Sequence, residues 1–258
     1  MSEATLLKDS KKNINKVGII VQARIGSKRF LGKVMKKVNN KPILYYMLKQ
    51  IQKSTLYDKI IIATSKRKEN NIIRQFCKKN KLICFSGSEN NLVNRYYLTA
   101  KKNKIDTIVR LTADCPLIDP QIIDLCIKKF LSKKYDFVAS TSPPFNKSYP
   151  DGMDVEVFSF ETIEKVNHVC KNKKDLEHVT PYIWRKKKRY KLYRFELEKN
   201  LSNYRLTLDY KEDFLLIKKI LINLYNKKKK ITMNKIINHL KKNKKIFLLN
   251  YKKNPYLK

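Results

Sequence analysis

The chain has 258 residues, of which 42% are hydrophobic, and this length allows one large α/β domain or two small ones. Its formal charge is +37, but the lysines are scattered over nearly every expected helix, so we interpret the excess as a solvated surface rather than as a specific nucleic-acid interface. The five cysteines include no C-x-x-C pair, which argues against a disulfide scaffold and a zinc site. The first segment is polar and no apolar run is long enough to span a membrane, which argues against a signal peptide and a membrane span. Together these features predict a cytoplasmic protein.

Strand and helix patterns alternate through the first half of the chain, after residues 1–16, which we expect to be a disordered tail. In chain order we expect a strand from Val17 to Val21, a helix opening at Pro42, a strand at Lys59–Thr64, a helix at Lys66–Asn80 with Ile72, Ile73, Phe76 and Cys77 inward, a strand at Leu82–Phe85, a helix at Glu89–Asn103, a strand at Ile105–Leu111, a helix opening at Pro120 and a strand at Tyr135–Ala139. This alternation predicts an α/β fold with a mostly parallel central sheet and helices on both faces.

The rhythm changes at a proline-rich polar loop over residues 142–151. Beyond it we expect a strand at Asp154–Phe160, helices at Phe160–Cys170 and Asp175–Trp184, strands at Tyr190–Leu197 and Tyr204–Leu208, and helices at Asp213–Tyr225 and near Met233–Leu240. The lysine run at 227–230 separates a main domain, residues 17–226, from a basic helical extension, residues 227–258.

The loop after the first strand has the composition of an anion-binding loop. It carries Arg24, Gly26, Ser27, Lys28, Arg29, Gly32 and Lys33. Backbone N–H groups and positive charge at the end of a buried strand suit phosphate groups. A P-loop is excluded, because five residues rather than four separate Gly26 from Gly32 and Val34 stands where a hydroxyl is required.

Two aspartates follow other expected strands. Asp114 follows the strand at 105–111 and Asp209 the strand at 204–208. Ligands of open parallel sheets bind at the carboxyl ends of strands, so this carboxylate pair suits a magnesium–nucleotide site. Structural alternatives remain: Asp114 could cap the turn before Pro116, and Asp209 could cap the next helix, with Glu212 at the capping-box spacing.

Six segments stand out in chain order: QARIGSKRFLGK, FSGSENNLVNRYY, RLTADCPLID, YPDGMDVEVFSFE, EHVTPYIW and RLTLDYKEDF. Together they resemble the cytidylyltransferase-like family. That family contains enzymes of the spore coat polysaccharide biosynthesis protein F type and is related to acylneuraminate and 3-deoxy-manno-octulosonate cytidylyltransferases. The resemblance covers about Val17 to Tyr225 and implies a Rossmann-like, glycosyltransferase-A-like nucleotidyltransferase fold. It implies an enzyme that couples a sugar or sugar acid to CMP, using CTP and Mg²⁺ and releasing pyrophosphate, in surface polysaccharide biosynthesis.

The resemblance also implies residue roles. Nucleotide contacts would come from Ala23, Arg24, Gly26, Ser27, Lys28, Arg29, Gly32, Lys33 and Arg95; metal binding from Asp114 and Asp209; catalysis from Lys28, Arg29, Asp114 and Asp209; and sugar contacts from Asp151, Asp154, Glu156 and His178. For Arg95 the structural alternative is a salt bridge, and for His178 a structural hydrogen bond. Leu31 replaces the proline of the usual R-L-P-G-K motif, so we expect a less preorganised loop and weaker nucleotide affinity.

Other functions stay open. A glycosyltransferase of the same fold would use a nucleotide sugar rather than make one. A basic nucleic-acid-binding protein is favoured only by charge, and carboxylates in a binding groove would repel phosphates unless a metal is present. Arg110 and Arg205 precede the two aspartate motifs and could either orient the aspartates or only flank them. By resemblance, a homodimer is plausible, with CTP and a small sugar as partners.

Overall fold

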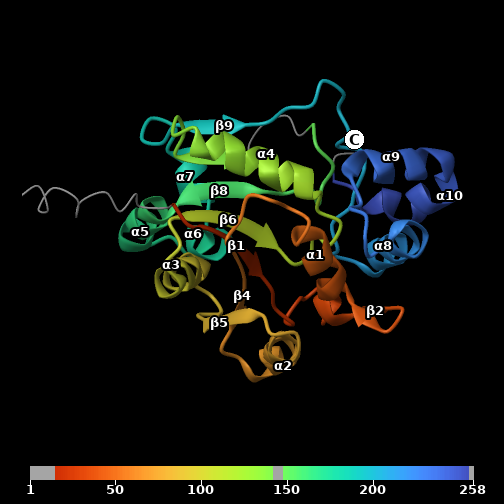
Figure 1. Ribbon diagram of the computed structural model, residues 1–258, viewed down its shortest axis with the longest axis horizontal. Helices are drawn as coiled ribbons and strands as arrows, with labels where there is room; N and C mark the ends of the chain where they lie inside the picture. Colours follow the sequence, from red (N-terminus) through yellow and green to blue (C-terminus); the bar gives the residue numbers. More distant parts are fainter. Residues whose placement is uncertain (1–14, 142–147, 256–258) are drawn as a thin grey trace, which may run out of the picture.

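A seven-stranded sheet forms the centre of the computed structural model, which describes residues 15–141 and 148–255 (Figure 1). The strands are β1 (Val17–Gln22), β4 (Lys59–Ser65), β5 (Ile83–Gly87), β6 (Thr107–Thr112), β7 (Phe137–Ala139), β8 (Glu156–Ser159) and β9 (Leu192–Arg194). Their order is β5-β4-β1-β6-β8-β7-β9, and only β8 runs antiparallel to its neighbours. The predicted mostly parallel sheet is confirmed. Of the predicted tail, residues 1–14 lie outside the described residues, as do 142–147 of the predicted loop.

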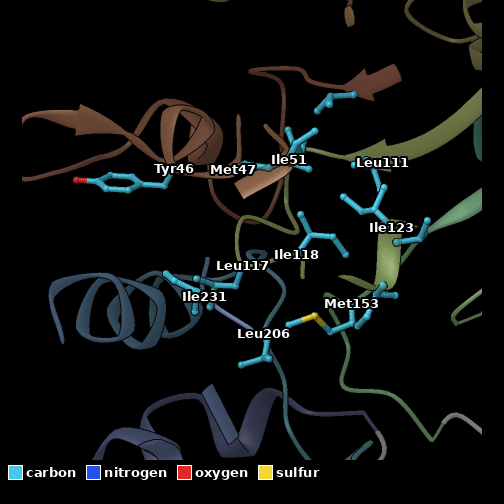
Figure 2. Packing of buried hydrophobic residues seen from close by; sticks show 14 of the residues in the cluster. Tyr46, Met47, Ile51, Leu111, Leu117, Ile118, Ile123, Met153, Leu206 and Ile231 are labelled. Atoms are coloured by element: carbon cyan, nitrogen blue, oxygen red, sulfur yellow. The ribbon is translucent and has the colours of Figure 1, made fainter. Parts of the chain in front are cut away.

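Helices cover both faces of this sheet. They are α1 (Ile43–Ile51), α2 (Asn71–Lys79), α3 (Leu92–Asn103), α4 (Pro120–Leu131), α5 (Phe160–Val169), α6 (Lys173–His178), α7 (Pro181–Arg185), α8 (Lys211–Leu224), α9 (Met233–Lys242) and α10 (Lys244–Phe247). Because side chains alternate along a strand, Ile19 and Val21 of β1 enter one core cluster while Ile20 enters the other. The first cluster includes Met47 of α1 and Ile123 of α4 (Figure 2). The second is covered by α3 and α5.

A small hairpin connects the loop after β1 to α1. Its strands, β2 (Lys37–Val38) and β3 (Lys41–Pro42), are antiparallel. Asn39 and Asn40 have positive φ angles of 44° and 60°, as a two-residue hairpin turn with the native twist requires. Pro42 then precedes α1, where its fixed φ suits a helix start.

Three predicted elements differ from the structure. Ile72 is 47% exposed rather than inward, because the buried face of the short α2 carries Ile73 and Cys77, four residues apart. The predicted helix at 175–184 is interrupted at Val179, whose φ is 72°, and divides into α6 and α7. The predicted strand at 204–208 is replaced by irregular chain with one bridge, Asp151 to Arg205, because its backbone bonds to loops instead.

The segment after the lysine run packs on the same core. Gln50 of α1 is fully buried and bonds to both the N–H and the carbonyl of Ile231. Ile236 and Leu240 of α9 are buried in the first core cluster. A 3₁₀ helix, Leu248–Lys253, follows α10 and contacts α8. Among the described residues, none of the helices combines the length and apolarity needed to traverse a bilayer.

Candidate functional site

The loop after β1 is closed by its own backbone hydrogen bonds. Gly32 N–H and Ser27 N–H both donate to the carbonyl of Ile25, at 3.0 and 2.7 Å. Gly32 has φ 65° and ψ 18°, and Lys33 N–H donates to Phe30 O at 3.3 Å. This is the pattern of a type II turn over Phe30–Lys33, in which the third position needs glycine. Lys33, the last residue of this turn, is buried.

A cavity of about 610 Å³ lies between this loop and the carboxyl ends of the strands. Its lining includes Gln22, Arg24, Gly26, Ser27, Lys28, Arg29, Lys33, Arg67, Glu69, Glu89, Asn90, Thr112, Asp114, Glu177 and Asp209. Six of the predicted nucleotide-binding residues and both predicted metal ligands therefore meet at one site. Ala23 is buried behind the loop and Gly32 shapes its turn, so neither lines the cavity. Its volume is in the range of small-molecule sites.

Lys33 joins the two predicted metal ligands. Its Nζ lies 2.9 Å from Asp114 Oδ2 and 2.9 Å from Asp209 Oδ1. Burial alone would lower the pKa of the Lys33 ammonium, but the charges of Asp114 and Asp209 outweigh it and raise that pKa. For Asp114, burial would raise the pKa, but the charge of Lys33 and a hydrogen bond from Thr112 lower it overall. The lysine is a cation held between the two carboxylates.

Asp209 has two further cationic neighbours. Arg29 Nη2, on the exposed side of the loop, lies 2.9 Å from Asp209 Oδ1. Arg205 Nη2 lies 3.2 Å from Asp209 Oδ2, and Arg205 also contacts Asp151 at 2.8 Å. Arg205 thus orients one predicted metal ligand. Arg110 has another role, because its Nη1 lies 2.6 Å from Glu156.

The start of α8 is capped by Asp213. The Asp213 carboxylate accepts from the backbone N–H groups of Asp209 and Tyr210, at 2.8 and 2.9 Å. The capping alternative for Asp209 is therefore wrong: its side chain faces the cavity, and Tyr210 occupies the N-cap position. The capping-box carboxylate is likewise not Glu212. The Asp114 carboxylate accepts from Lys33 Nζ at 2.9 Å, and its turn-capping alternative stays open.

Arg95 lies behind the cavity wall. It is fully buried, and its Nε donates to Ser88 O at 2.7 Å while Nη2 donates to Glu89 O at 3.2 Å. It is not among the residues that line the cavity. The structure therefore places this predicted nucleotide contact as a support for the segment that carries Glu89.

A second cavity of about 460 Å³ adjoins the first, and Thr112 lines both. Three of the four predicted sugar-binding residues, Asp154, Glu156 and His178, line it, together with Trp184. Asp151 does not, because it pairs with Arg205. Figure 1 shows β8, which begins at Glu156, next to β6, which ends at Thr112.

Glu156 and Asp154, two carboxylates of the second cavity, differ in the protein groups that they contact. Glu156 is buried and bonded to Arg110 and to Thr180 Oγ1, the latter at 2.9 Å. Asp154 accepts from Gly152 N–H at 2.8 Å and from Thr141, without a cation within ion-pair distance in the described part of the chain. Asp154 is therefore the less engaged of these two carboxylates in the wall of the cavity.

Cys115 sits between the two cavities. Its thiol lies 3.6 Å from Asp154 Oδ2 and 3.9 Å from Asp114 Oδ1. Burial, with the charges of Asp154 and Asp114, raises the pKa of this thiol well above its usual value. It is a weak hydrogen-bond donor to the two carboxylates rather than a nucleophile.

The donor set fits a hard divalent cation that is shared with a phosphate-bearing ligand. Among residues 15–141 and 148–255, no group of three or more metal-ligating side chains is found, so a cage made by protein alone is absent there. Magnesium, however, is commonly held by one or two carboxylates together with substrate phosphates and waters. A cationic ammonium already lies between Asp114 and Asp209, which shows that the pair accommodates positive charge.

Several site residues were not predicted from sequence. Gln22 and Glu89 line the first cavity, and Asn250 bonds to Asp213 at 2.7 Å from the 3₁₀ helix at Leu248–Lys253. For Gln22 a signal existed, since it ends the first buried strand. For Asn250 the sequence carries none, because its position depends on how the last helices fold back.

Comparisons with known proteins agree with this geometry. A family model described as "Cytidylyltransferase" matches residues 18–250. An uncharacterized protein of Methanocaldococcus jannaschii is 35% identical over 235 residues, covering 90% of this chain and 93% of the relative. The spore coat polysaccharide biosynthesis protein SpsF of Bacillus subtilis is 29% identical over 212 residues, covering 80% and 86%. A solved structure of a cytidylyltransferase from Leptospira borgpetersenii is 34% identical, covers 90% of this chain and 96% of its own, and superposes with a TM-score of 0.84.

Proposed function

This chain belongs to the cytidylyltransferase family, and we propose that it couples a sugar or sugar acid to CMP from CTP, with release of pyrophosphate, in the synthesis of a surface polysaccharide. One observation carries the proposal: the cations of the Arg24–Lys33 loop and the Asp114–Asp209 pair line one cavity, and a second cavity opens beside it at Thr112. The relative from B. subtilis, named for spore coat polysaccharide biosynthesis, supports the pathway class.

We further propose Mg²⁺ as the cofactor, held by Asp114 and Asp209 together with the nucleotide's phosphates. When bound, it would supply charge neutralisation at the phosphoryl oxygens. Lys28, Arg29 and Lys33 line the same cavity and would balance the negative charge that develops on the departing pyrophosphate. Arg205 would keep Asp209 oriented, since it contacts that carboxylate at 3.2 Å.

The second cavity would hold the acceptor. A sugar hydroxyl there would attack the α-phosphorus, so that the new O–P bond forms as the bond to the pyrophosphate oxygen breaks, and the hydroxyl proton would pass to water. Asp154 and His178 line this cavity and would orient hydroxyl groups, while the ring of Trp184 offers an apolar face for the sugar. Positioning two substrates side by side is the main contribution that such a site makes to the rate.

The test is a pyrophosphate-release assay with CTP, Mg²⁺ and a panel of nonulosonic and other sugar acids and sugar phosphates. Pyrophosphate that appears only when one acceptor is present, in equal amount to a CMP-sugar, supports the proposal. Transfer from a ready-made nucleotide sugar, without any pyrophosphate, would instead identify the glycosyltransferase alternative. Sedimentation of the same preparation would test the predicted homodimer.

A further inference from the structure

Part of the first cavity's wall is made by the end of β1 and the segment before α3. Gln22 is the last residue of β1 and, two residues after Ile20, points to the sheet face that α3 covers. Glu89 precedes α3, and its Oε1 lies 3.6 Å from Arg24 Nη1. Both Gln22 and Glu89 line the cavity.

Two buried oxygens in this wall have no hydrogen-bond partner among the described residues: Gln22 Oε1 and Glu89 Oε2. Buried polar atoms are nearly always paired, so an unpaired acceptor in the wall of a ligand cavity calls for an explanation. A ligand that supplies N–H or O–H donors there would satisfy both atoms. An ionised carboxylate can only accept, whereas an amide can present either an acceptor or a donor.

The segment that carries Glu89 is fixed before any ligand binds. Arg95 holds the carbonyls of both Ser88 and Glu89, and the preceding residue, Gly87, is packed so tightly that a Cβ there would lie 2.8 Å from Arg95 Cγ. These contacts fix the backbone position from which the Glu89 carboxylate reaches the cavity. Such a site discriminates by leaving its buried polar group unpaired when the wrong ligand binds.

We propose that Glu89 is the specificity-determining residue for the nucleobase, with its carboxylate accepting from the exocyclic amine of cytosine and Gln22 Oε1 as a second acceptor. This inference rests on the proposed function, in which CTP is the nucleotide. Uracil carries a carbonyl oxygen at the same position, which would face the Glu89 carboxylate without a hydrogen. Carboxylates accept from the cytosine amine in other recognition settings. Both oxygens are shielded from solvent, which suits an enclosed base better than an exposed ribose.

Binding of nucleotides alone tests this, without knowledge of the sugar. The full-length chain would be titrated calorimetrically with CTP, UTP and 2′-deoxy-CTP in the presence of Mg²⁺. We expect wild type to bind CTP at least about tenfold more tightly than UTP, and Glu89→Gln to lower this ratio about tenfold, because glutamine can donate to the uracil oxygen. Glu89→Asp, which keeps an acceptor-only group, should retain a preference for CTP.

Glu69→Gln is the matched control. Glu69 is an exposed carboxylate that lines the same cavity beside Gly26, so its loss should change CTP and UTP binding alike. A CTP-to-UTP ratio that Glu89→Gln leaves unchanged would overturn the inference while the proposed function stands. So would a Glu89→Gln variant whose altered preference is between CTP and 2′-deoxy-CTP, since Glu89 would then face the ribose. Wild type without measurable CTP binding would overturn the proposed function itself, and this inference with it. Loss of the Arg24 contact would weaken the binding of CTP and UTP alike, so it would leave the CTP-to-UTP ratio unchanged.

Discussion

Arg205 and Asp213 form a two-point ion pair in the protein interior, with Nε 3.0 Å from Oδ1 and Nη2 3.1 Å from Oδ2. Asp213 is fully buried, and its carboxylate also caps the start of α8. The same guanidinium reaches Asp209 and Asp151. Arg205, which does not line the cavity, therefore helps to position Asp209, which does.

Replacing Asp209 with asparagine should abolish the reaction and preserve the fold. One of the two carboxylates facing the loop loses its charge, so we expect pyrophosphate release to fall at least about a hundredfold, with an unchanged circular dichroism spectrum. Glu212→Gln is the control, because Glu212 is a part-exposed carboxylate three residues further along the chain, in the first turn of α8. Wild-type turnover in Asp209→Asn would contradict the assignment.

Replacing Arg205 with lysine should separate turnover from affinity. A single ammonium cannot reproduce the planar fork that contacts Asp151, Asp209 and Asp213. We expect kcat to fall about tenfold or more while KM for CTP changes little, since Arg205 does not line the cavity. Steady-state kinetics measure both constants. A variant with raised KM and unchanged kcat would indicate direct contact with the nucleotide instead.

Replacing Lys33 with methionine should make stability respond to Mg²⁺. Without the ammonium, Asp114 and Asp209 face each other with less compensation, so we expect Tm to fall in the absence of metal and to recover more than wild type does when Mg²⁺ is added. Thermal melts with EDTA or excess Mg²⁺ measure this. Lys28→Met, at an exposed position of the same cavity, should behave as wild type. Equal responses in all three proteins would argue against a cation site at the aspartate pair.

Replacing Leu31 with proline should rigidify the loop. Leu31 occupies the second position of the turn over Phe30–Lys33, where proline is favoured, and its side chain is 69% exposed. We expect a gain of about 0.4–1 kcal/mol in the free energy of unfolding and tighter CTP binding. Gly32→Ala is the opposite control, because φ of 65° strains any other residue. Denaturant titration and calorimetry measure the two effects; weaker CTP binding by Leu31→Pro would show that the loop must move.

The contribution of the Asp114–Lys33 pair to stability should be flat near neutral pH and lost in acid. Because the pKa of Asp114 is lowered from 3.8 in the folded protein, its contribution is complete above about pH 5 and disappears as pH falls through the lowered pKa. The raised pKa of Lys33 keeps the pair intact until pH rises beyond 10.5. Urea denaturation should show wild type about 1–3 kcal/mol more stable than Asp114→Asn from about pH 5 to 9, with the difference shrinking below 3.8. A difference that grew in acid would contradict the pairing.

The sheet and the loop were predictable because they depend on local pattern. A few adjacent residues are enough to predict the buried strands, the turn at Asn39-Asn40 and the helix start at Pro42. The carboxyl ends of strands in a parallel sheet also meet at one edge. The meeting of Asp114 and Asp209 was predicted, but the rule accounts only for Asp114, which follows β6, because irregular chain rather than a strand carries Asp209 to the site.

Contacts that depend on long-range packing were not predictable. Nothing local distinguishes Asp213 from Glu212 as the cap of α8, since the choice is made by Arg205 on a neighbouring segment. The break at Val179 arises because its side chain is fully buried while the chain turns. Arg95 lies in one of the segments that carry the family resemblance, yet its side chain supports the wall of the cavity and does not line it.

Asn250 donates to Arg205 O and to Asp213 Oδ1, at 3.0 and 2.7 Å, across 45 and 37 residues of sequence. During synthesis, the contacts of Arg205 and Asp213 are therefore left incomplete until Asn250 has left the ribosome. A nascent chain that stops short of Asn250 would carry every loop cation and both cavity aspartates. It would lack the hydrogen bonds that Asn250 makes to Arg205 and Asp213. Competence to react would thus arrive only after the segment that carries Asn250 has been synthesised.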